Sequence, residues 1–317
     1  MVRPLAGLTR PVASAHGRSG KQALAQARLS RNEHINGWMF IAPALVLLGI
    51  FMIYPILWSL WMSFQVGKGM NFSFGGFANI VRLTKDPIFI RALVNTCIFF
   101  VVQVPIMLVL AMLFAVALND STLRFRGLFR TAIFLPCVTS LIAYSTLFKS
   151  MFATDGVVND FLLAIWVIQE PIHWLQDPFW AKVLIILAIT WRWTGYNMVF
   201  YLAALQNIDR SIYEAARVDG VPAWGRFWYI TVPMLKPVIL FTSVISTIGT
   251  LQLFDEVNNI TVGGPSDATL TLSLYIYNLT FKFMPSFGYS ATVSWVIVVM
   301  VAILSFLQFL VARDRRT

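Results

Sequence analysis

The side chains that could do chemistry in this 317-residue chain lie in two stretches of otherwise apolar sequence. In the first, Trp193 and Tyr196 recur at helical spacing, and Arg192 and Asn197 flank them. Aromatic faces stack on the C–H groups of sugars, and polar side chains bind sugar hydroxyls through hydrogen bonds. In the second stretch, one predicted helix face carries a polar stripe that ends in a leucine: Ser243, Ser246, Thr250 and Leu253.

Two such stripes, facing each other, favour a site for a hydroxyl-rich ligand. The alternative is structural, because Ser and Thr also join apolar helices through hydrogen bonds, and aromatic residues also simply pack.

The chain lacks the residue groups that catalysis and metal binding need. No nucleophile–base pair occurs in the apolar segments, and the three histidines lie far apart, at His16, His34 and His173. Cys97 and Cys137 both lie within apolar runs, as small buried residues do. No phosphate-binding G-x-x-x-x-G-K-[ST] sequence is present. We therefore expect no catalytic residue, no metal site and no cofactor in this chain.

The composition indicates a membrane protein. Hydrophobic residues make up 58% of the chain and charged residues 12%, whereas soluble domains carry about 25% charged residues. These values exclude an ordinary soluble enzyme, a disordered chain and a disulfide scaffold. The net charge is +10, but the basic residues are scattered between apolar blocks, so nucleic-acid binding is not expected.

Six apolar blocks are long enough to cross a bilayer, which takes about 20 residues per helix. The blocks cover residues 37–64, 88–118, 128–148, 181–205, 237–257 and 287–311, with Pro136 breaking the third. The first is too long for the core of a signal peptide and is expected to remain as an anchor. A further apolar segment, 157–168, is too short to span and is expected to form a loop or interfacial helix. The predicted fold is all-α, with six transmembrane helices.

The distribution of basic residues predicts the orientation. With the N-terminus inside, sixteen Lys and Arg residues lie in cytoplasmic segments and seven in outer ones. The positive-inside rule thus favours both termini in the cytoplasm. The predicted organisation is a basic cytoplasmic tail at 1–36, the first transmembrane helix with its outer loop at 37–88, a core of five transmembrane helices at 89–312, and a cytoplasmic end at 313–317.

One cytoplasmic loop, residues 206–236, contains a recognisable motif. Taken alone, Glu214-Ala215-Ala216 followed by Gly220 indicates only a surface helix and a turn. With Ile230 and Pro233 at the observed spacing, the segment resembles the EAA loop of permeases of binding-protein-dependent ABC importers. One departure is Val232, where the family usually has Leu before the proline.

The resemblance covers most of the chain, from about residue 38 to 312. Within the family, the chain is similar to the maltose-type, carbohydrate branch. Four further motifs carry it: Tyr54-Pro55, Asp86-Pro87, Phe129-Arg130-Thr131 with Leu135-Pro136, and Gly263-Gly264-Pro265. The chain lacks the extra N-terminal helices and the large periplasmic insert of the maltose permease itself. It resembles the shorter form seen in permeases for lactose, other oligosaccharides and glycerol phosphate. The resemblance implies the type I ABC importer permease fold and a bacterial cytoplasmic (inner) membrane location.

The resemblance also implies partners and a role for the loop. A helix in the loop would dock in a groove of a separate ATP-binding subunit, which would hold the ATP and Mg and supply the energy. The implied coupling residues are Tyr213, Glu214, Ala215, Ala216, Arg217, Asp219 and Gly220. One loop offers one docking helix, so a second homologous permease is expected beside an ATPase dimer. An extracytoplasmic solute-binding protein would deliver the substrate.

In maltose-type permeases the substrate contacts come from the fourth and fifth spans. The substrate-path residues expected here are Arg192, Trp193, Tyr196, Asn197, Ser246, Thr250 and Leu253. Arg192 lies roughly 15 Å from the outer end of its span, near the bilayer midplane, where a charge usually faces a cavity or a partner. In a straight fifth helix Asp255 lies roughly 27 Å up, about 12 Å from the level of Arg192, too far for a direct pair of Arg192 with Asp255 or Glu256 without bending. Arg192 is therefore expected to face the aqueous path, or else to meet a carbonyl or the second permease.

Other functions stay open from the sequence. A non-sugar or anionic solute such as glycerol phosphate is the main alternative, because Arg192 lies in the path. A proton- or sodium-driven carrier would need ionisable groups at midplane, and Arg192 is the one candidate. At the outer mouth, the polar run 255–259 could contact the binding protein or gate the path, or could be a solvated helix end.

Overall fold

A computed structural model describes residues 36–69, 71–120 and 122–313. The chain divides into two compact units between Ser59 and Leu60. The predicted cytoplasmic tail and end therefore lie almost entirely outside the described residues. The described part of the first unit belongs to a single apolar helix, Asn36–Ser63, with a mean hydropathy of 2.4. This helix contains a π-helical turn, η1 (Gly49–Ile53), followed by α2 (Tyr54–Ser63).

The second unit is almost entirely helical. Its long helices are α4 (Pro87–Asn119), α8 (Pro178–Gln206), α11 (Val232–Leu251) and α14 (Phe287–Arg313). The shorter helices are α3 (Ala78–Lys85), α5 (Arg126–Val138), α6 (Leu141–Met151), α7 (Val157–Ala164), α9 (Arg210–Val218), α10 (Ala223–Arg226), α12 (Asp255–Ile260) and α13 (Leu272–Tyr277). Two π-helical turns, η2 (Phe227–Thr231) and η3 (Asn278–Lys282), join helices in this unit. Among the described residues, the strands are β1 (Gln65–Lys68) and β2 (Asn71–Phe74), an antiparallel hairpin that the all-α prediction did not include.

Five helices are long and apolar enough to cross a membrane, or six if a bent pair counts as one span. This confirms the prediction of a helical, multi-pass chain. The bent pair is α5 and α6, which meet at 102° in place of the predicted third span. The break lies at Thr139 and Ser140, three residues beyond its predicted position, and Pro136 lies inside α5. Both break residues have extended backbones, and the Thr139 hydroxyl donates to the Pro136 carbonyl at 2.7 Å.

The helices that carry the predicted site pack closely on one another. Helix α8 lies against α4 and α5, and at Gly195 the backbones of α8 and α5 are close together. A Cβ atom at this position would lie 2.1 Å from the Ile133 carbonyl oxygen of α5, so only glycine fits without a shift of the backbone. Small Ala111 and Ala115 of α4 are fully buried in the same packing region. The close packing fixes α8 against its neighbours.

The fifth span differs from its prediction at both ends. Its helical run begins at Ala223, where 237 was predicted, and passes through α10 and η2 into α11. It ends at Leu251, where 257 was predicted, and the chain then turns into α12. The Thr271 hydroxyl donates to the Leu253 carbonyl at 2.7 Å and so holds the turn. The predicted loop helix at 157–168 is confirmed as α7.

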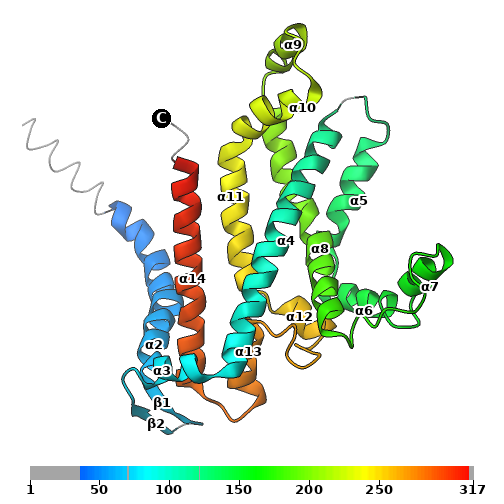
Figure 1. Ribbon diagram of the computed structural model, residues 1–317. Helices are drawn as coiled ribbons and strands as arrows, with labels where there is room; N and C mark the ends of the chain where they lie inside the picture. Colours follow the sequence, from blue (N-terminus) through cyan, green and yellow to red (C-terminus); the bar gives the residue numbers. More distant parts are fainter. Residues whose placement is uncertain (1–35, 70, 121, 314–317) are drawn as a thin grey trace, which may run out of the picture. The chain divides into compact units, whose positions relative to one another are not determined.

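The loops of the second unit separate into two ends (Figure 1). Helices α9 and α10 project at one end, where α4 ends and α5 begins. Helices α6, α7, α12 and α13 lie at the opposite end, together with the hairpin. The first end thus holds the loops that were predicted to be cytoplasmic, and the second end holds the loops that were predicted to be outside.

Candidate functional site

Helix α8 supplies the aromatic side of the site. The helix starts where the Asp177 carboxylate accepts hydrogen bonds from the Phe179 and Trp180 backbone N–H groups, both at 2.9 Å. About four turns into the helix, Trp193 and Tyr196 pack edge to face, with ring centroids 5.9 Å apart. The aromatic stripe predicted from helical spacing is therefore present.

Helix α11 supplies the opposing polar side, and a cavity of about 430 Å³ lies between the two helices. All seven residues predicted for the substrate path line this one cavity: Arg192, Trp193, Tyr196, Asn197, Ser246, Thr250 and Leu253. Helix α11 packs against both α4 and α8. The structure thus brings together two stripes that are about 50 residues apart.

A hydrogen-bonded polar network forms part of the cavity wall. The Thr250 hydroxyl donates to Gln103 Oε1 of α4 at 3.0 Å, and the Ser246 hydroxyl donates to Asn197 Oδ1 at 3.4 Å. Asn197 in turn donates to the Trp193 carbonyl at 3.1 Å. Gln103, Asn197 and Thr250 are all buried. The network holds polar side chains from three helices at fixed positions in the wall.

Sequence reasoning missed Gln103, although a signal was present. It is the one glutamine in the apolar block 88–118, and a polar side chain deep in a predicted span usually has a partner or a function. Met107, one helical turn further, also lines the cavity. The third wall of the site, from α4, was therefore absent from the prediction.

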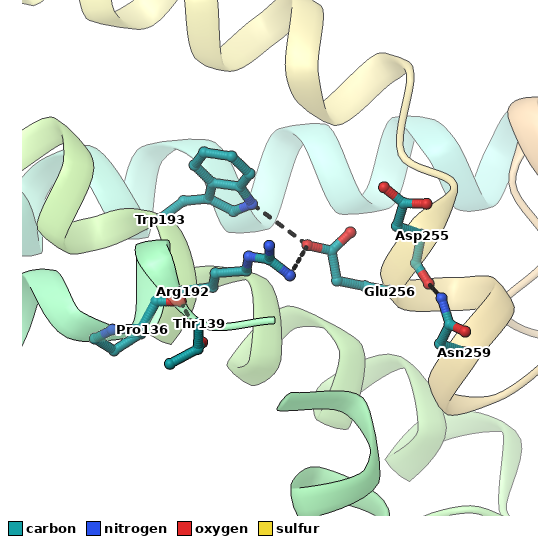
Figure 2. A network of polar contacts seen from close by, with 7 residues as sticks. All are labelled: Pro136, Thr139, Arg192, Trp193, Asp255, Glu256 and Asn259. Atoms are coloured by element: carbon teal, nitrogen blue, oxygen red, sulfur yellow. Dashed lines mark hydrogen bonds and ion pairs between the residues drawn. The ribbon is translucent and has the colours of Figure 1, made fainter. Parts of the chain in front are cut away.

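An ion pair closes one side of the cavity, contrary to the sequence argument. Arg192 Nη1 lies 3.9 Å from Glu256 Oε1, and the Trp193 indole N–H donates to the same oxygen at 3.4 Å (Figure 2). A straight fifth helix would have kept these residues about 12 Å apart in depth. The helix ends at Leu251 instead, and α12 brings Glu256 back to α8. The expectation that Arg192 cannot reach this carboxylate is wrong, but Arg192 does line the cavity as expected.

The surroundings of Arg192 restrict its movement. Its guanidinium lies over the ring of Tyr144 at 5.1 Å and over the ring of Trp193 at 5.6 Å. Tyr144 belongs to α6, the second half of the bent pair, and α6 packs against α12. The bend at Thr139 and Ser140 thus places an aromatic ring beside the ion pair.

Burial and the two partners act in opposite directions on Glu256, which lies in α12 outside the long apolar helices. Burial raises the pKa of its carboxyl, and a hydrogen bond from its own backbone N–H, the Arg192 guanidinium and the Trp193 indole oppose that rise. The net direction is upward, so burial outweighs these partners.

The predicted coupling motif forms helix α9. Its first turn is capped by the Asp209 carboxylate, which accepts from the Ser211 N–H at 2.9 Å. Hydrogen bonds from the Ser211 backbone and hydroxyl lower the pKa of Asp209. At the other end Gly220 has a φ of +73°, a conformation that favours glycine, and its N–H donates to the Arg217 carbonyl.

The seven motif residues divide into anchors and exposed positions. Ala216 is buried and Tyr213 is half-buried, with the tyrosine hydroxyl 3.0 Å from the Thr231 hydroxyl. The others are exposed: Glu214, Ala215, Arg217, Asp219 and Gly220. Trp224 and Tyr229, which the sequence reasoning did not select, are also large and exposed beside this helix in the chain. The motif therefore presents a fixed helix with a solvent-facing surface.

The described residues, with positions 70 and 121 left out, contain no group of three or more His, Cys, Asp or Glu side chains arranged to hold a metal ion. The cavity is lined by aromatic, hydrogen-bonding and charged side chains.

Known proteins resemble this chain along most of its length. The family model for the binding-protein-dependent transport system inner membrane component matches residues 72–317. The lactose transport system permease protein LacF of Rhizobium radiobacter is 68% identical over 92% of this chain and 98% of its own length. An arabinooligosaccharides transport system permease protein, AraP of Halalkalibacterium halodurans, is 33% identical over 86% of this chain and 85% of its own.

Solved structures share the fold. A chain of a bacterial ABC transporter involved in the import of the acidic polysaccharide alginate matches with a TM-score of 0.76 at 23% identity, covering 92% of this chain and all of the other. A second structure, of the bacterial alginate transporter in complex with an alginate pentasaccharide-bound periplasmic protein, gives 0.72 at 25% identity, covering 92% of this chain and 96% of the other. The family match and these relatives show a transport component that crosses the membrane several times: the chain belongs to the binding-protein-dependent transport system inner membrane components, the permeases of ABC importers.

Proposed function

We propose that this chain is the permease subunit of a carbohydrate ABC importer, and that the cavity between α8 and α11 holds the sugar in transit. The observation that carries the proposal is the composition of that single cavity. An aromatic pair, Trp193 and Tyr196, faces a polar wall that includes Ser246 and Thr250. Aromatic faces and fixed hydrogen-bonding groups are what a sugar needs for recognition.

The names of the relatives support the class of substrate. The chain is 68% identical to a lactose transport system permease and 33% identical to an arabinooligosaccharide permease. Lactose or a related oligosaccharide is therefore the proposed substrate. The catalytic step of such an importer, ATP hydrolysis, is assigned to a separate subunit, because the chain has no phosphate-binding loop.

The exposed face of α9 is proposed to dock with that ATP-binding subunit. Glu214 and Arg217 are exposed charges on a helix whose ends are fixed by Asp209 and Gly220. Such a helix suits recognition by insertion into a groove of a partner. The complete importer is proposed to contain a second, homologous permease, an ATP-binding dimer and an extracytoplasmic solute-binding protein, in the bacterial cytoplasmic membrane.

Uptake of labelled lactose tests the sugar site. Trp193→Ala removes the aromatic platform, and a loss of roughly 1–3 kcal/mol of stacking and hydrogen bonding should reduce transport more than tenfold. The matched control is Trp166→Ala, since Trp166 is 90% exposed and does not line the cavity. ATPase activity stimulated by the loaded binding protein should largely survive, because α9 is unchanged. Wild-type uptake and sugar affinity in correctly assembled Trp193→Ala and Tyr196→Ala transporters would refute the proposed site.

A further inference from the structure

Three charged side chains line the cavity, and their surroundings differ. They are Arg192 on α8 and two neighbours on α12, Asp255 and Glu256. The side chains of Arg192 and Glu256 are only 12% and 7% exposed, whereas Asp255 is exposed. The formal charge of the lining is therefore −1, although Arg192 taken alone would favour an anionic ligand.

Glu256 covers Arg192, in the sense that its carboxylate places a negative charge next to the guanidinium. The Glu256 carboxylate is directed toward Arg192 and Trp193, while Asp255 extends elsewhere (Figure 2). Arg192 Nη1 and Nε are both buried and have no hydrogen-bond partner among the described residues. The carboxylate at 3.9 Å is thus the nearest counter-charge on the described part of the chain. Trp193, which donates to the same carboxylate, fixes the pair to the aromatic platform.

We propose that Glu256 determines charge specificity: by covering Arg192 it makes the cavity accept neutral sugars and reject anionic ones. This inference rests on the proposed function of the cavity as a sugar site. Two like charges a few ångströms apart repel strongly where water is scarce, so an anionic sugar meets Glu256 before it gains from Arg192. A neutral sugar meets no such opposition, and it stacks on Trp193 beside a fixed ion pair.

The arrangement also explains how the same fold can serve acidic substrates. A chain of the alginate transporter, which imports an acidic polysaccharide, superposes on this chain with a TM-score of 0.76. Charge preference must therefore lie in individual side chains and not in the architecture. In this chain the arginine is present but covered, so a single carboxylate decides the preference.

The test compares three disaccharide probes that share one skeleton and differ in charge: lactitol, which is neutral, lactobionate, which is anionic, and 1-amino-1-deoxylactitol, which is cationic. Binding to the full chain, purified with its partner subunits in lipid nanodiscs, is measured by saturation-transfer NMR without binding protein. Glu256→Gln uncovers Arg192 and should tighten lactobionate binding at least tenfold relative to lactitol binding by the same variant. Arg192→Gln leaves the carboxylate uncovered and should tighten binding of the cationic probe instead.

Two matched variants separate covering from a general change of charge. Asp255→Asn removes the same formal charge from the same cavity but leaves the pair intact, so it should not gain the lactobionate affinity of Glu256→Gln. The double variant Arg192→Gln with Glu256→Gln should gain affinity for neither charged probe relative to lactitol. If Glu256→Gln fails to assemble, the cationic probe on Arg192→Gln still tests the inference.

The outcomes also separate this inference from the proposed function. If the wild-type complex and the double variant bind none of the probes, the cavity is not a sugar site. If wild type binds lactitol but each single variant keeps the wild-type order of the three probes, the sugar site stands and the role of Glu256 is overturned. Equal gains for Asp255→Asn and Glu256→Gln would overturn it as well, since net charge alone would then explain the selectivity.

Discussion

At the scale of single residues, one carboxylate joins three helices at the end opposite α9. Asp86 begins α4 by accepting from the Ile88 and Phe89 N–H groups, at 2.9 and 3.3 Å. Its other oxygen accepts from the hydroxyls of Tyr275 on α13 and Tyr289 on α14, at 2.5 and 2.6 Å. The sequence identified Asp86 only as part of a family motif with Pro87. The two tyrosines are about 190 and 200 residues away, and no local pattern connects them to it.

We expect Asp86→Asn to lower the free energy of unfolding by about 1–3 kcal/mol, because hydrogen bonds to a charged acceptor are replaced by weaker ones. Asp120→Asn, at the exposed far end of the same helix, is the matched control and should change little. Thermal unfolding of the purified chain in lipid nanodiscs measures the difference. Equal melting temperatures for the two variants would show that Asp86 is not the structural junction we infer.

The pH dependence of that difference has a definite sign. Burial tends to raise the pKa of Asp86, but the hydrogen bonds from Tyr275, Tyr289 and α4 outweigh it, so the pKa is lowered. A carboxylate with a lowered pKa stabilises the fold above its unfolded pKa of about 3.9 and loses this stabilisation as the pH falls through the folded value. The gap between wild type and Asp86→Asn should thus be constant near neutral pH and shrink below about pH 4.

At the scale of elements, sequence periodicity and hydropathy predicted most helices but placed their breaks less well. The block at 128–148 was expected to break at Pro136, three residues before the observed break, and the helix at 237–257 was expected to continue through the segment 252–254, which contains neither glycine nor proline. The second break depends on a tertiary hydrogen bond, from Thr271 to Leu253. Since α6 and α12 follow these breaks, the ion pair of Arg192 and Glu256 could not be predicted from the sequence.

The residues that line the cavity were predicted more fully than the ion pair that closes one side of it. The residues on α8 and α11 follow from helical spacing together with the family resemblance, which indicated the two spans to compare. Gln103 was missed because α4 carried no motif, although the one glutamine in an apolar block was a usable signal. The spacing of residues along a helix shows which of them share a face, whereas only the packed structure shows which helices face each other.

For helix α9, we expect Glu214→Lys or Gly220→Pro to abolish sugar uptake while insertion into the membrane stays normal. Glu214 is exposed on the proposed docking face, and proline cannot adopt the φ of +73° found at Gly220. Glu170→Lys provides a matched charge reversal in the exposed segment between α7 and α8. Uptake into proteoliposomes and ATPase activity are measured together. Wild-type uptake by both α9 variants in an intact complex would disprove coupling through this helix.

At the scale of the whole molecule, the division of the second unit into two ends agrees with the distribution of charge. Three helix ends with predicted cytoplasmic basic residues, the start of α5, the start of α9 and the end of α14, lie at the end that carries α9 (Figure 1). The side of the membrane on which this end lies stays a prediction from the positive-inside rule. The cavity belongs to the same unit, and the elements that close it, α6 and α12, lie at the opposite end. This arrangement suits a permease that is coupled at one face and loaded from the other.

The most direct measurement of the central claim is the position of the sugar in the assembled transporter. We expect a cryo-electron microscopy map of the importer, trapped with lactose and without a hydrolysable nucleotide, to show sugar density between α8 and α11. The sugar should stack on Trp193 within hydrogen-bond distance of the polar wall at Ser246 and Thr250, and the density should be absent from Trp193→Ala. A sugar bound elsewhere along the membrane path, with an empty cavity between these helices, would contradict the account.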